Sequence, residues 1–309
     1  MKIIFFGTPE IAKRILEQLV KADLDVIAVV TNPDKAVGRS SQKRPSPVKN
    51  FALEHGIPVY QPIKASNIEF AAFLETLKAD LFVVAAYSEI LKENILDMPP
   101  KGCINVHASL LPKYRGAAPM QRAIMAGEKE TGVTIMQMTP QLDAGAMLHV
   151  VKIPIPDDMT SGELFEEMAK AGGEALLKTL VDIERGTIKP LEQDAHETTY
   201  ASKLKTEDGK LNFENSAKDV YNQFRGVTPK PGAYCMVEVN GKLKKMLIKK
   251  ARRSAESGKR AGEILSSSEL LVACADGGSI NLLEVQLEGK RVLSAHDFLK
   301  GTPVHNLKF

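Results

Sequence analysis

The first thirty residues read as a strand, a helix and a second strand, and no other feature of the chain limits its fold as strongly. The apolar run Lys2–Phe6 ends in a Gly-Thr-Pro turn, and the apolar run Asp25–Val30 follows after a helix-length segment. Four apolar residues of that segment recur with the helical period: Ile11, Ile15, Leu16 and Leu19. A strand, a helix and a strand at this spacing predict a right-handed βαβ unit, and hence a parallel sheet.

The same alternation continues to about Glu184. Further strands are expected at Pro58–Gln61, Leu81–Ala86, Gly102–Val106, Thr131–Met138 and Met147–Pro154. Helices are expected at Val48–His55, Ile68–Leu77, Pro119–Ala126 and from Thr160 to about Glu184. We therefore predict an α/β domain over residues 1–188, with an open, mainly parallel, Rossmann-like sheet. The first turn lacks the G-x-G-x-x-G fingerprint, so no dinucleotide site is expected there, and Gly7 is explained by backbone geometry.

The last third of the chain has a different pattern. Residues 189–206 show little periodicity and are interpreted as a linker, which leaves residues 207–309 as a second domain. A short helix is expected at Ala217–Arg225. The sequence Asn240-Gly241 separates two alternating runs and predicts a β-hairpin. The strands expected in this domain are Ala233–Val239, Leu243–Lys249, Glu263–Leu265, Leu270–Cys274, Ile280–Gln286 and Arg291–Ser294. Short strands at this even spacing indicate a small β-barrel, with an OB-type fold as one candidate.

Charge is unevenly distributed along the chain. The net charge is +3, but residues 207–309 hold 17 Lys and Arg against 12 Asp and Glu. Nine of these basic residues lie in Lys242–Arg260, beside a single acid. Such a run is often only a solvated face, but on a small β-barrel it favours contact with nucleic acid. A second basic segment, Asn32–Pro47, holds four basic residues, one acid and three prolines, and is expected to be a mobile loop beside the ligand-binding edge of the sheet, or simply solvated.

Several classes of protein are excluded by what the sequence lacks. No apolar run approaches the roughly 18–20 residues that span a bilayer, and the first residues enter a strand without a signal-peptide pattern. The cysteines, Cys103, Cys235 and Cys274, are too few and too far apart for a disulfide framework or a zinc site. We expect a cytoplasmic protein without a metal.

The candidate chemistry lies at the end of the strand that precedes His107. Asn105 and His107 are two residues apart, so on a strand they point to the same face. Asp143 follows a later strand, and the carboxyl ends of strands are where an open α/β sheet binds ligands. An amide, an imidazole and a carboxylate can stabilise an oxyanion and move protons, which suits acyl transfer by direct attack of the acceptor. Taken alone, Asn105 is better explained as a turn cap and His107 as a core histidine.

Six runs of the sequence, taken together, resemble a known family over essentially the whole chain. They are FGTPE (6–10), PSPVK (45–49), VAAY (84–87), NVHASLLPKYRGAAP (105–119), ETGVTIMQM (130–138) and LDAG (142–145). The chain is similar to the 10-formyltetrahydrofolate-dependent formyltransferase superfamily, and within it to the methionyl-tRNA formyltransferase family. It departs from the expected pattern at Ser88, Ala108 and Ala146, and at Lys230-Pro231, where Trp-Pro is usual.

The resemblance assigns roles to particular residues. It implies the formyltransferase fold, and it makes Asn105, His107 and Asp143 the catalytic residues. It places the folate co-substrate along Ser109, Leu110, Leu111 and Pro112 and against Tyr87. It directs the basic loop, with Arg39, Lys43 and Arg44, toward the acceptor end of the tRNA, and it gives the second domain a tRNA-binding role in which we include Lys244, Lys245, Lys249 and Lys250.

We accordingly expect a monomeric enzyme that transfers the formyl group of 10-formyltetrahydrofolate to the α-amino group of methionyl initiator tRNA. Two alternatives stay open at this point. One is a formyltransferase of the same superfamily with a smaller acceptor, such as glycinamide ribonucleotide or an amino sugar. The other is a non-catalytic RNA-binding protein that kept the fold. The basic second domain weighs against the first alternative, and the intact Asn-x-His and Asp weigh against the second.

Overall fold

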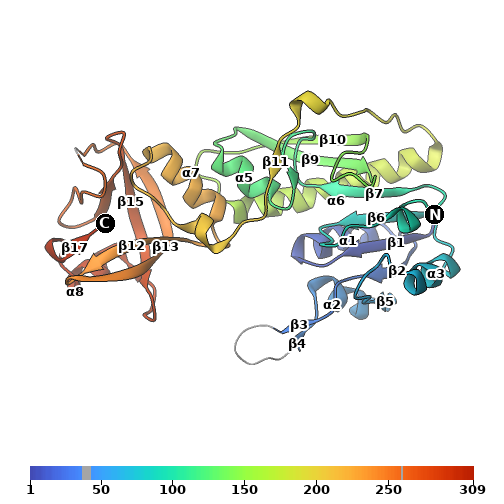
Figure 1. The fold of residues 1–309 in the computed structure, drawn as a ribbon, viewed down its shortest axis with the longest axis horizontal. Coiled ribbons are helices and arrows are strands. Elements are labelled where there is room, and N and C mark those ends of the chain that lie inside the picture. Colours follow the sequence, from blue (N-terminus) through green and yellow to red (C-terminus); the bar gives the residue numbers. More distant parts are fainter. Residues whose placement is uncertain (37–42, 259) are drawn as a thin grey trace. The chain divides into compact units, whose positions relative to one another are not determined.

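The computed structural model describes residues 1–36, 43–258 and 260–309, which form two compact units (Figure 1). The first unit consists of residues 1–116, 131–154 and 165–200. The second consists of residues 117–130, 155–164 and 201–309. The second unit therefore takes in two segments from inside the range predicted for the catalytic domain. One of them contains α5 (Pro119–Met125), which packs on α7 (Ala217–Val227).

A seven-stranded sheet forms the centre of the first unit, in the order β10-β9-β7-β6-β1-β2-β5. The strands are β1 (Ile3–Gly7), β2 (Val26–Val30), β5 (Val59–Tyr60), β6 (Leu81–Ala85), β7 (Cys103–His107), β9 (Glu130–Gln137) and β10 (Met147–Pro154). The pairs β1–β2, β1–β6, β2–β5 and β6–β7 are parallel, whereas β7–β9 is antiparallel. The prediction of an open, mainly parallel, Rossmann-like sheet is confirmed. Because these strands run the same way, β6 and β7 end at the same edge.

Helices pack against this sheet through buried apolar faces. They are α1 (Glu10–Lys21), α2 (Pro47–Glu54), α3 (Ile68–Thr76), α4 (Glu93–Leu96) and α6 (Ser161–Arg185), of which the residues from Phe165 onward belong to this unit. Helix α1 buries Ala12, Ile15, Leu16 and Leu19. Each large apolar side chain among them contributes roughly 1.5–3 kcal/mol by leaving water. A Cβ atom on Gly7 would lie 2.7 Å from Ala12 Cβ, so this glycine is required for close packing of α1 on β1.

An antiparallel, half-barrel sheet forms the core of the second unit, in the order β14-β15-β13-β12-β17, with β16 paired to β15. The strands are β12 (Ala233–Val239), β13 (Lys242–Ser254), β14 (Leu270–Ala273), β15 (Ser279–Leu287), β16 (Leu293–Ser294) and β17 (Leu307–Lys308). The predicted hairpin is confirmed: Val239 pairs with Lys242, and Asn240 and Gly241 both have positive φ. The fold class predicted for this domain is thereby confirmed in its main feature, a small antiparallel β domain.

Some local expectations differ from the structure. Strand β13 runs on to Ser254 through an irregularity near Lys250, because β15 offers a second pairing partner along its whole length. Residues 263–265 form no strand; only Ile264 makes an isolated bridge, to Val272. The sequence pattern missed α8 (Ala295–Gly301), a helix whose N-cap Ser294 accepts a hydrogen bond from the backbone N–H of Asp297. The remaining short elements are β3 (Lys35–Ala36), β4 (Lys43–Arg44), β8 (Arg115–Gly116), β11 (Tyr200–Ala201) and 3₁₀ turns at Ala195–Glu197, Thr206–Gly209 and Val304–Asn306.

Candidate active site

Strand β7 positions Asn105 and His107 at the carboxyl edge of the parallel sheet. Asn105 pairs with Val84 of β6 and Met136 of β9, and His107 pairs with Thr134 of β9. Partners on both sides fix the backbone of β7, so the two side chains have defined directions on one face. Asn105 is half-buried, whereas the His107 side chain is almost fully enclosed.

The hydrogen bonds of His107 determine which ring nitrogen is available. Its Nε2 lies 3.1 Å from the backbone oxygen of Tyr114. A carbonyl oxygen only accepts, so Nε2 carries a proton and donates it in this bond. The other nitrogen, Nδ1, lies 3.7 Å from Oδ2 of Asp143, which is too long for a direct hydrogen bond. Nδ1 is therefore the nitrogen that faces the carboxylate and is not engaged by the backbone.

Asp143 lies in the turn between β9 and β10, and this turn has an unusual backbone conformation. Its own φ is +47°, in the left-handed region, and its Oδ2 accepts a hydrogen bond of 2.8 Å from the backbone N–H of Gly116. A Cβ atom on Gly145 would lie 2.0 Å from the backbone oxygen of Gln137. Glycine at 145 lets the chain turn against β9, and this explains why Asp143 and Gly145 occur together in the Leu-Asp-Ala-Gly run.

The Asn105 side-chain amide makes no hydrogen bond to any of the residues described, although it is half-buried. The amide is therefore open to solvent or to a ligand. The site thus brings together a free amide donor, an imidazole nitrogen and a carboxylate. Such a set can polarise a carbonyl group, stabilise an oxyanion and move one proton.

Two residues outside the sequence prediction hold Asp143 in place. Gln193 donates its amide hydrogens to the backbone oxygens of Asp143 (2.9 Å) and Gly145 (2.7 Å). Its Oε1 in turn accepts hydrogen bonds from Nε (3.1 Å) and Nη2 (2.7 Å) of Arg115. Gln193 lies in the aperiodic stretch interpreted as a linker, where a polar side chain gives no signal of a long-range contact. Arg115 lies in the quoted Asn105–Pro119 run, but its partner could not be read from that run.

The turn predicted to meet the folate is mostly internal. Ser109 is 0% exposed, its Oγ donates to the backbone oxygen of Lys113 (2.7 Å), and its own backbone oxygen accepts from Thr134 Oγ1 (2.7 Å). Leu111 and Pro112 are also buried and are joined by a cis peptide bond, whereas Leu110 is half-exposed. Ser109 thus shapes the turn, and Leu110 is the side chain of this turn that a ligand can reach most easily.

Tyr87, also predicted to meet the folate, lies at the end of β6 and is 9% exposed. Its hydroxyl donates to Oε2 of Glu89 at 3.3 Å, and burial raises the pKa of the phenol well above its usual range. Tyr87 is therefore a neutral, donating group at neutral pH. The neighbouring Ser88 accepts a 2.6 Å hydrogen bond from Nδ2 of Asn32, which ties the ends of β2 and β6 together.

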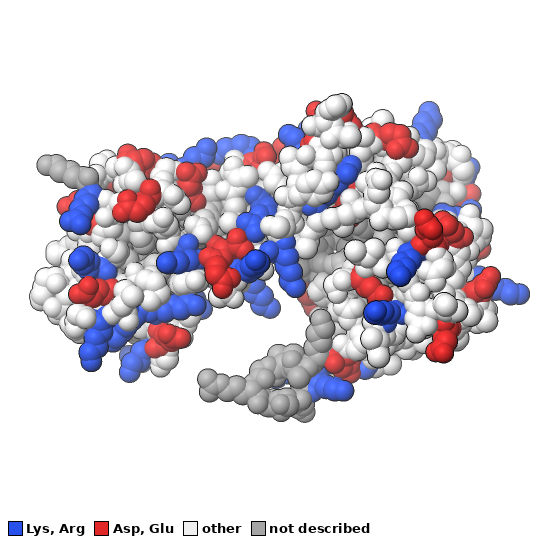
Figure 2. All heavy atoms as spheres, in the orientation of Figure 1, with Lys and Arg blue, Asp and Glu red and all other residues white. Residues whose placement is uncertain are grey.

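The predicted tRNA-contact residues lie in both units. Arg39 lies outside the described residues, while Lys43 and Arg44 are exposed on β4, which pairs with β3. On β13, Lys245 shares the face of Leu247, and Lys244 shares the face of Met246; Lys249 lies between Ile248 and Lys250, where the pairing with β15 is irregular. Lys245 Nζ lies 3.8 Å from the centre of the Tyr234 ring. Lys250 sits at the irregularity in β13. Figure 2 shows Lys and Arg side chains gathered along the lower edge of the second unit, with few acids among them.

Neither a membrane span nor a metal cluster was found in the part of the chain that the structure describes. None of its helices is long and apolar enough to cross a bilayer. Within residues 1–36, 43–258 and 260–309, no three His, Cys, Asp or Glu side chains are placed to hold a metal ion. All three cysteines are buried and unpaired, and burial raises the pKa of Cys103 to about 12. These thiols are therefore protonated and unreactive at neutral pH.

Comparison with known proteins places this geometry in context. A formyl transferase family match covers residues 1–180, and a match to the formyl transferase C-terminal domain covers residues 203–303. The chain is 45% identical over 310 residues to a methionyl-tRNA formyltransferase of Protochlamydia amoebophila, spanning 100% of this chain and 98% of the relative. It is 44% identical over 313 residues to that of Chlamydia pneumoniae, with 100% and 97% covered. The crystal structure of WlaRD, a sugar 3N-formyl transferase, superposes with a TM-score of 0.69 at 23% identity, with 94% and 99% covered, and so shares the fold.

Proposed function

This chain belongs to the methionyl-tRNA formyltransferase family, and we propose that Asn105, His107 and Asp143 form its catalytic centre. The enzyme transfers the formyl group of 10-formyltetrahydrofolate to the α-amino group of methionyl initiator tRNA for translation initiation. The observation that carries the proposal is the meeting of three groups at one sheet edge. They are the unengaged amide of Asn105, Nδ1 of His107, and Oδ2 of Asp143 at 3.7 Å from that nitrogen.

The proposed reaction is a direct attack. The neutral amine of methionyl-tRNA attacks the formyl carbon, a new C–N bond forms, and the formyl oxygen becomes an oxyanion. The Asn105 amide and the protonated Nδ1 of His107 donate hydrogen bonds to this oxygen, an arrangement in which each donor contributes roughly 10²–10³ in kcat. As the bond between the formyl carbon and the folate nitrogen breaks, the proton lost by the amine reaches that nitrogen.

Asp143 supports this proton transfer in two ways. Its Oδ2 lies 3.7 Å from Nδ1 of His107 and would orient the imidazole toward the reacting formyl group. It also accepts the proton from the attacking amine and passes it on. The N–H of Gly116 holds the carboxylate in position, so only one oxygen is free to move a proton.

The donor set fits a formyl group, which has one oxygen to be polarised and no charge of its own in the ground state. We propose that the folate lies against Leu110 and the Tyr87 turn, and that Ser109, Leu111 and Pro112 act by shaping the binding turn. The tRNA would contact Arg39, Lys43 and Arg44 of the basic loop. Lys244, Lys245, Lys249 and Lys250 on β13 would add phosphate contacts in the second unit.

An acceptor panel tests the proposed function. Purified protein is given 10-formyltetrahydrofolate with methionyl initiator tRNA, glycinamide ribonucleotide or a nucleotide-linked amino sugar, and formylated product is measured. We expect rapid formylation of the methionyl-tRNA alone. Formylation of a small acceptor with no reaction on the tRNA would overturn the assignment, and binding of tRNA without any formyl transfer would favour a non-catalytic RNA-binding protein.

Gln193 is proposed as a positioning residue for Asp143. Gln193→Ala removes both hydrogen bonds to the turn that carries Asp143, and we expect kcat to fall about 10- to 30-fold, because small displacements of reacting groups are costly. KM for the folate and for the tRNA should stay within about twofold, since the hydrogen bonds of Gln193 go to Arg115 and to the turn of Asp143. Glu192→Ala, an exposed neighbour, is the matched control. Unchanged kcat in the Gln193 variant would remove it from this role.

We also propose that the enzyme is a cytoplasmic monomer. Three buried, unpaired cysteines suit a reducing compartment. Light scattering of the purified protein tests the oligomeric state, with one chain per particle as the expected result.

A further inference from the structure

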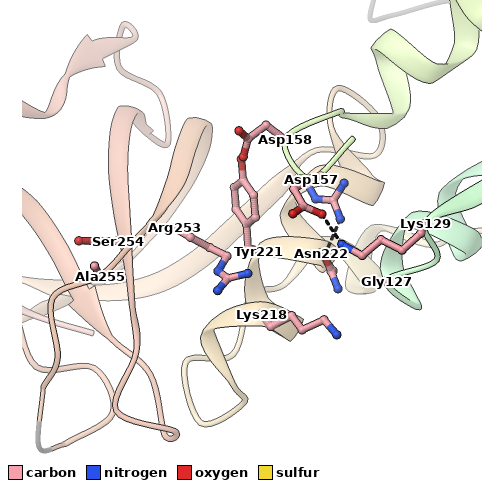
Figure 3. Close-up of a pocket in the computed structure, with 11 residues that line it drawn as sticks. Gly127, Lys129, Asp157, Asp158, Lys218, Tyr221, Asn222, Arg253, Ser254 and Ala255 are labelled. Carbon is pink, nitrogen blue, oxygen red and sulfur yellow. Dashed lines mark hydrogen bonds and ion pairs between the residues drawn. The ribbon is translucent and has the colours of Figure 1, made fainter. Parts of the chain in front are cut away.

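A pocket in the second unit holds a surplus of hydrogen-bond donors. It has a volume of about 340 Å³ and lies between helix α7, the end of strand β13 and two loops (Figure 3). Every residue that lines it belongs to the second unit. None of the residues assigned above to catalysis, folate or tRNA is among them. We call it the donor pocket, after the side chains of Lys218, Asn222 and Arg253 that line it.

Both carboxylates of the donor pocket are already engaged. Asp157 is ion-paired with Lys129, which together with the nearby guanidinium groups lowers the pKa of this carboxyl. Asp158 Oδ1 accepts a 2.9 Å hydrogen bond from the hydroxyl of Tyr221. The pocket lining holds four cations, Lys129, Lys218, Arg225 and Arg253, against these two carboxylates, so it carries a net positive charge.

Asn222 presents a buried amide to the donor pocket. Its side chain is 5% exposed, and its Oδ1 accepts a 2.5 Å hydrogen bond from Nη2 of Arg225, so the amide nitrogen Nδ2 points away from Arg225. Nδ2 has no acceptor among the described residues. A Cβ atom on Gly127 would lie 2.7 Å from Nδ2 and 3.7 Å from Cε of Lys218. Glycine at 127 thus leaves open the space in which these two donors meet.

Arg225 lines the donor pocket and is fixed there by hydrogen bonds. It is 4% exposed, and its Nη1 donates to the backbone oxygens of Pro156 (3.2 Å) and Met159 (3.0 Å). The guanidinium also donates to Oδ1 of Asn222, so this buried hydrogen-bond network fixes the direction of the Asn222 Nδ2 group.

Lys218 and Arg253 complete the donor pocket. Arg253 of β13 lies opposite the buried Ile280 of β15, on the face of β13 that also carries Ala251. Arg252 points to the opposite face. Figure 3 shows the Arg253 guanidinium extending from β13 toward helix α7, with Lys218 and Asn222 on that helix and Lys129 on the loop after α5; the Lys218 ammonium is directed away from Arg253. Neither Lys218 nor Arg253 has an ion-pair partner in the described part of the chain.

We propose that the donor pocket binds a phosphate group of RNA, supplied by the backbone of the tRNA substrate, an inference that rests on the proposed function. A guanidinium fork, an ammonium group and an amide N–H match the several oxygens of a phosphate better than the two of a carboxylate. RNA is the source that the enzyme already binds, and its phosphates enter such sites without regard to base sequence. The contact would bind the tRNA body at a defined position, in addition to the contacts proposed for the lysines of β13.

Arg252 and Arg253 point to opposite faces of β13, so substitution of Arg252 is a matched control for substitution of Arg253. Lys218→Ala, Arg253→Ala and the double variant are compared with Arg252→Ala for binding of uncharged initiator tRNA between 50 and 200 mM salt. Loss of one phosphate contact flattens the plot of log K against log salt by about 0.7–0.9, and we expect this for each donor-pocket variant, with tRNA binding about three- to tenfold weaker. Arg252→Ala should bind nearly as the parent does, and kcat at saturating tRNA should be unchanged in all variants.

The outcomes separate the possible errors. Equal effects of Arg252→Ala and Arg253→Ala would mean a diffuse charge effect, and unchanged tRNA binding in the double variant would exclude an RNA contact; either result overturns the proposal. A second experiment titrates the parent and the double variant with inorganic phosphate. If the double variant lost phosphate binding but still bound tRNA as the parent does, the pocket would be a site for a free anion, and the proposal would likewise be overturned. The proposed function fails separately, if the parental enzyme does not formylate methionyl-tRNA.

Discussion

Replacing Asn105, His107 or Asp143 by alanine is expected to lower kcat by about 10²–10⁴, the range for losing an oxyanion donor or a proton-transfer group. Each change removes an interaction that is made fully only in the transition state. Dissociation constants for folate and for tRNA should therefore stay within a fewfold of the parent. Single-turnover formylation with both substrates in excess of their dissociation constants measures the effect on chemistry directly.

The three alanine variants should also differ from one another in thermal stability. His107→Ala leaves the backbone oxygen of Tyr114 without its donor, and Asp143→Ala releases the N–H of Gly116, so thermal unfolding is measured alongside. Asn105→Asp is the informative near-isostere, because it replaces the donor by a negative charge beside the oxyanion and should be as inactive as the alanine variant. If any one of the three alanine variants kept near-parental kcat while folded, the role given to that residue would be wrong.

Removal of the lysines on β13 is expected to have the second-largest effect. A Lys→Ala variant at Lys244, Lys245, Lys249 and Lys250 should bind tRNA about 10²-fold more weakly near physiological salt, with the salt slope flattened by about 0.7–0.9 for each phosphate contact that is lost. Activity toward a minimal acceptor that lacks the tRNA body should be almost unchanged. The site in the first unit contains none of these residues, so chemistry itself is spared.

Controls for this experiment come from the two faces of β13 and from the first unit. Lys245 points to the face opposite Lys242 and Lys244, so Lys245→Ala, compared with Lys242→Ala and Lys244→Ala, shows which face contacts the RNA. A quadruple alanine variant at exposed lysines of the first unit (Lys64, Lys101, Lys170 and Lys178) matches the change in net charge. Equal weakening in that control would indicate only a general loss of charge, and β13 would then be a solvated face.

Much of the fold follows from local sequence patterns. Strand β1, helix α1 and strand β2 lie where the apolar periodicity predicts them, because burial of one face is decided by residues close together in the chain. The β12–β13 hairpin follows from Asn240-Gly241, whose positive φ angles few other dipeptides tolerate. Residues 263–265 and helix α8 were not predicted correctly, since short elements depend on their packing partners more than on their own pattern.

The sequence alone determined that Asn105 and His107 share a face, because side chains alternate along any strand, and its motifs predicted Asp143 as their third partner. Only the tertiary structure decided what each group can do. It places β7 between β6 and β9, engages Nε2 of His107 with Tyr114 and leaves Nδ1 beside Asp143. It also brings Gln193 to the Asp143 turn, and Asn222 and Arg253 to one pocket. These contacts join residues far apart in the chain, and no local periodicity encodes them, because they form only once the packed elements have fixed each backbone in place.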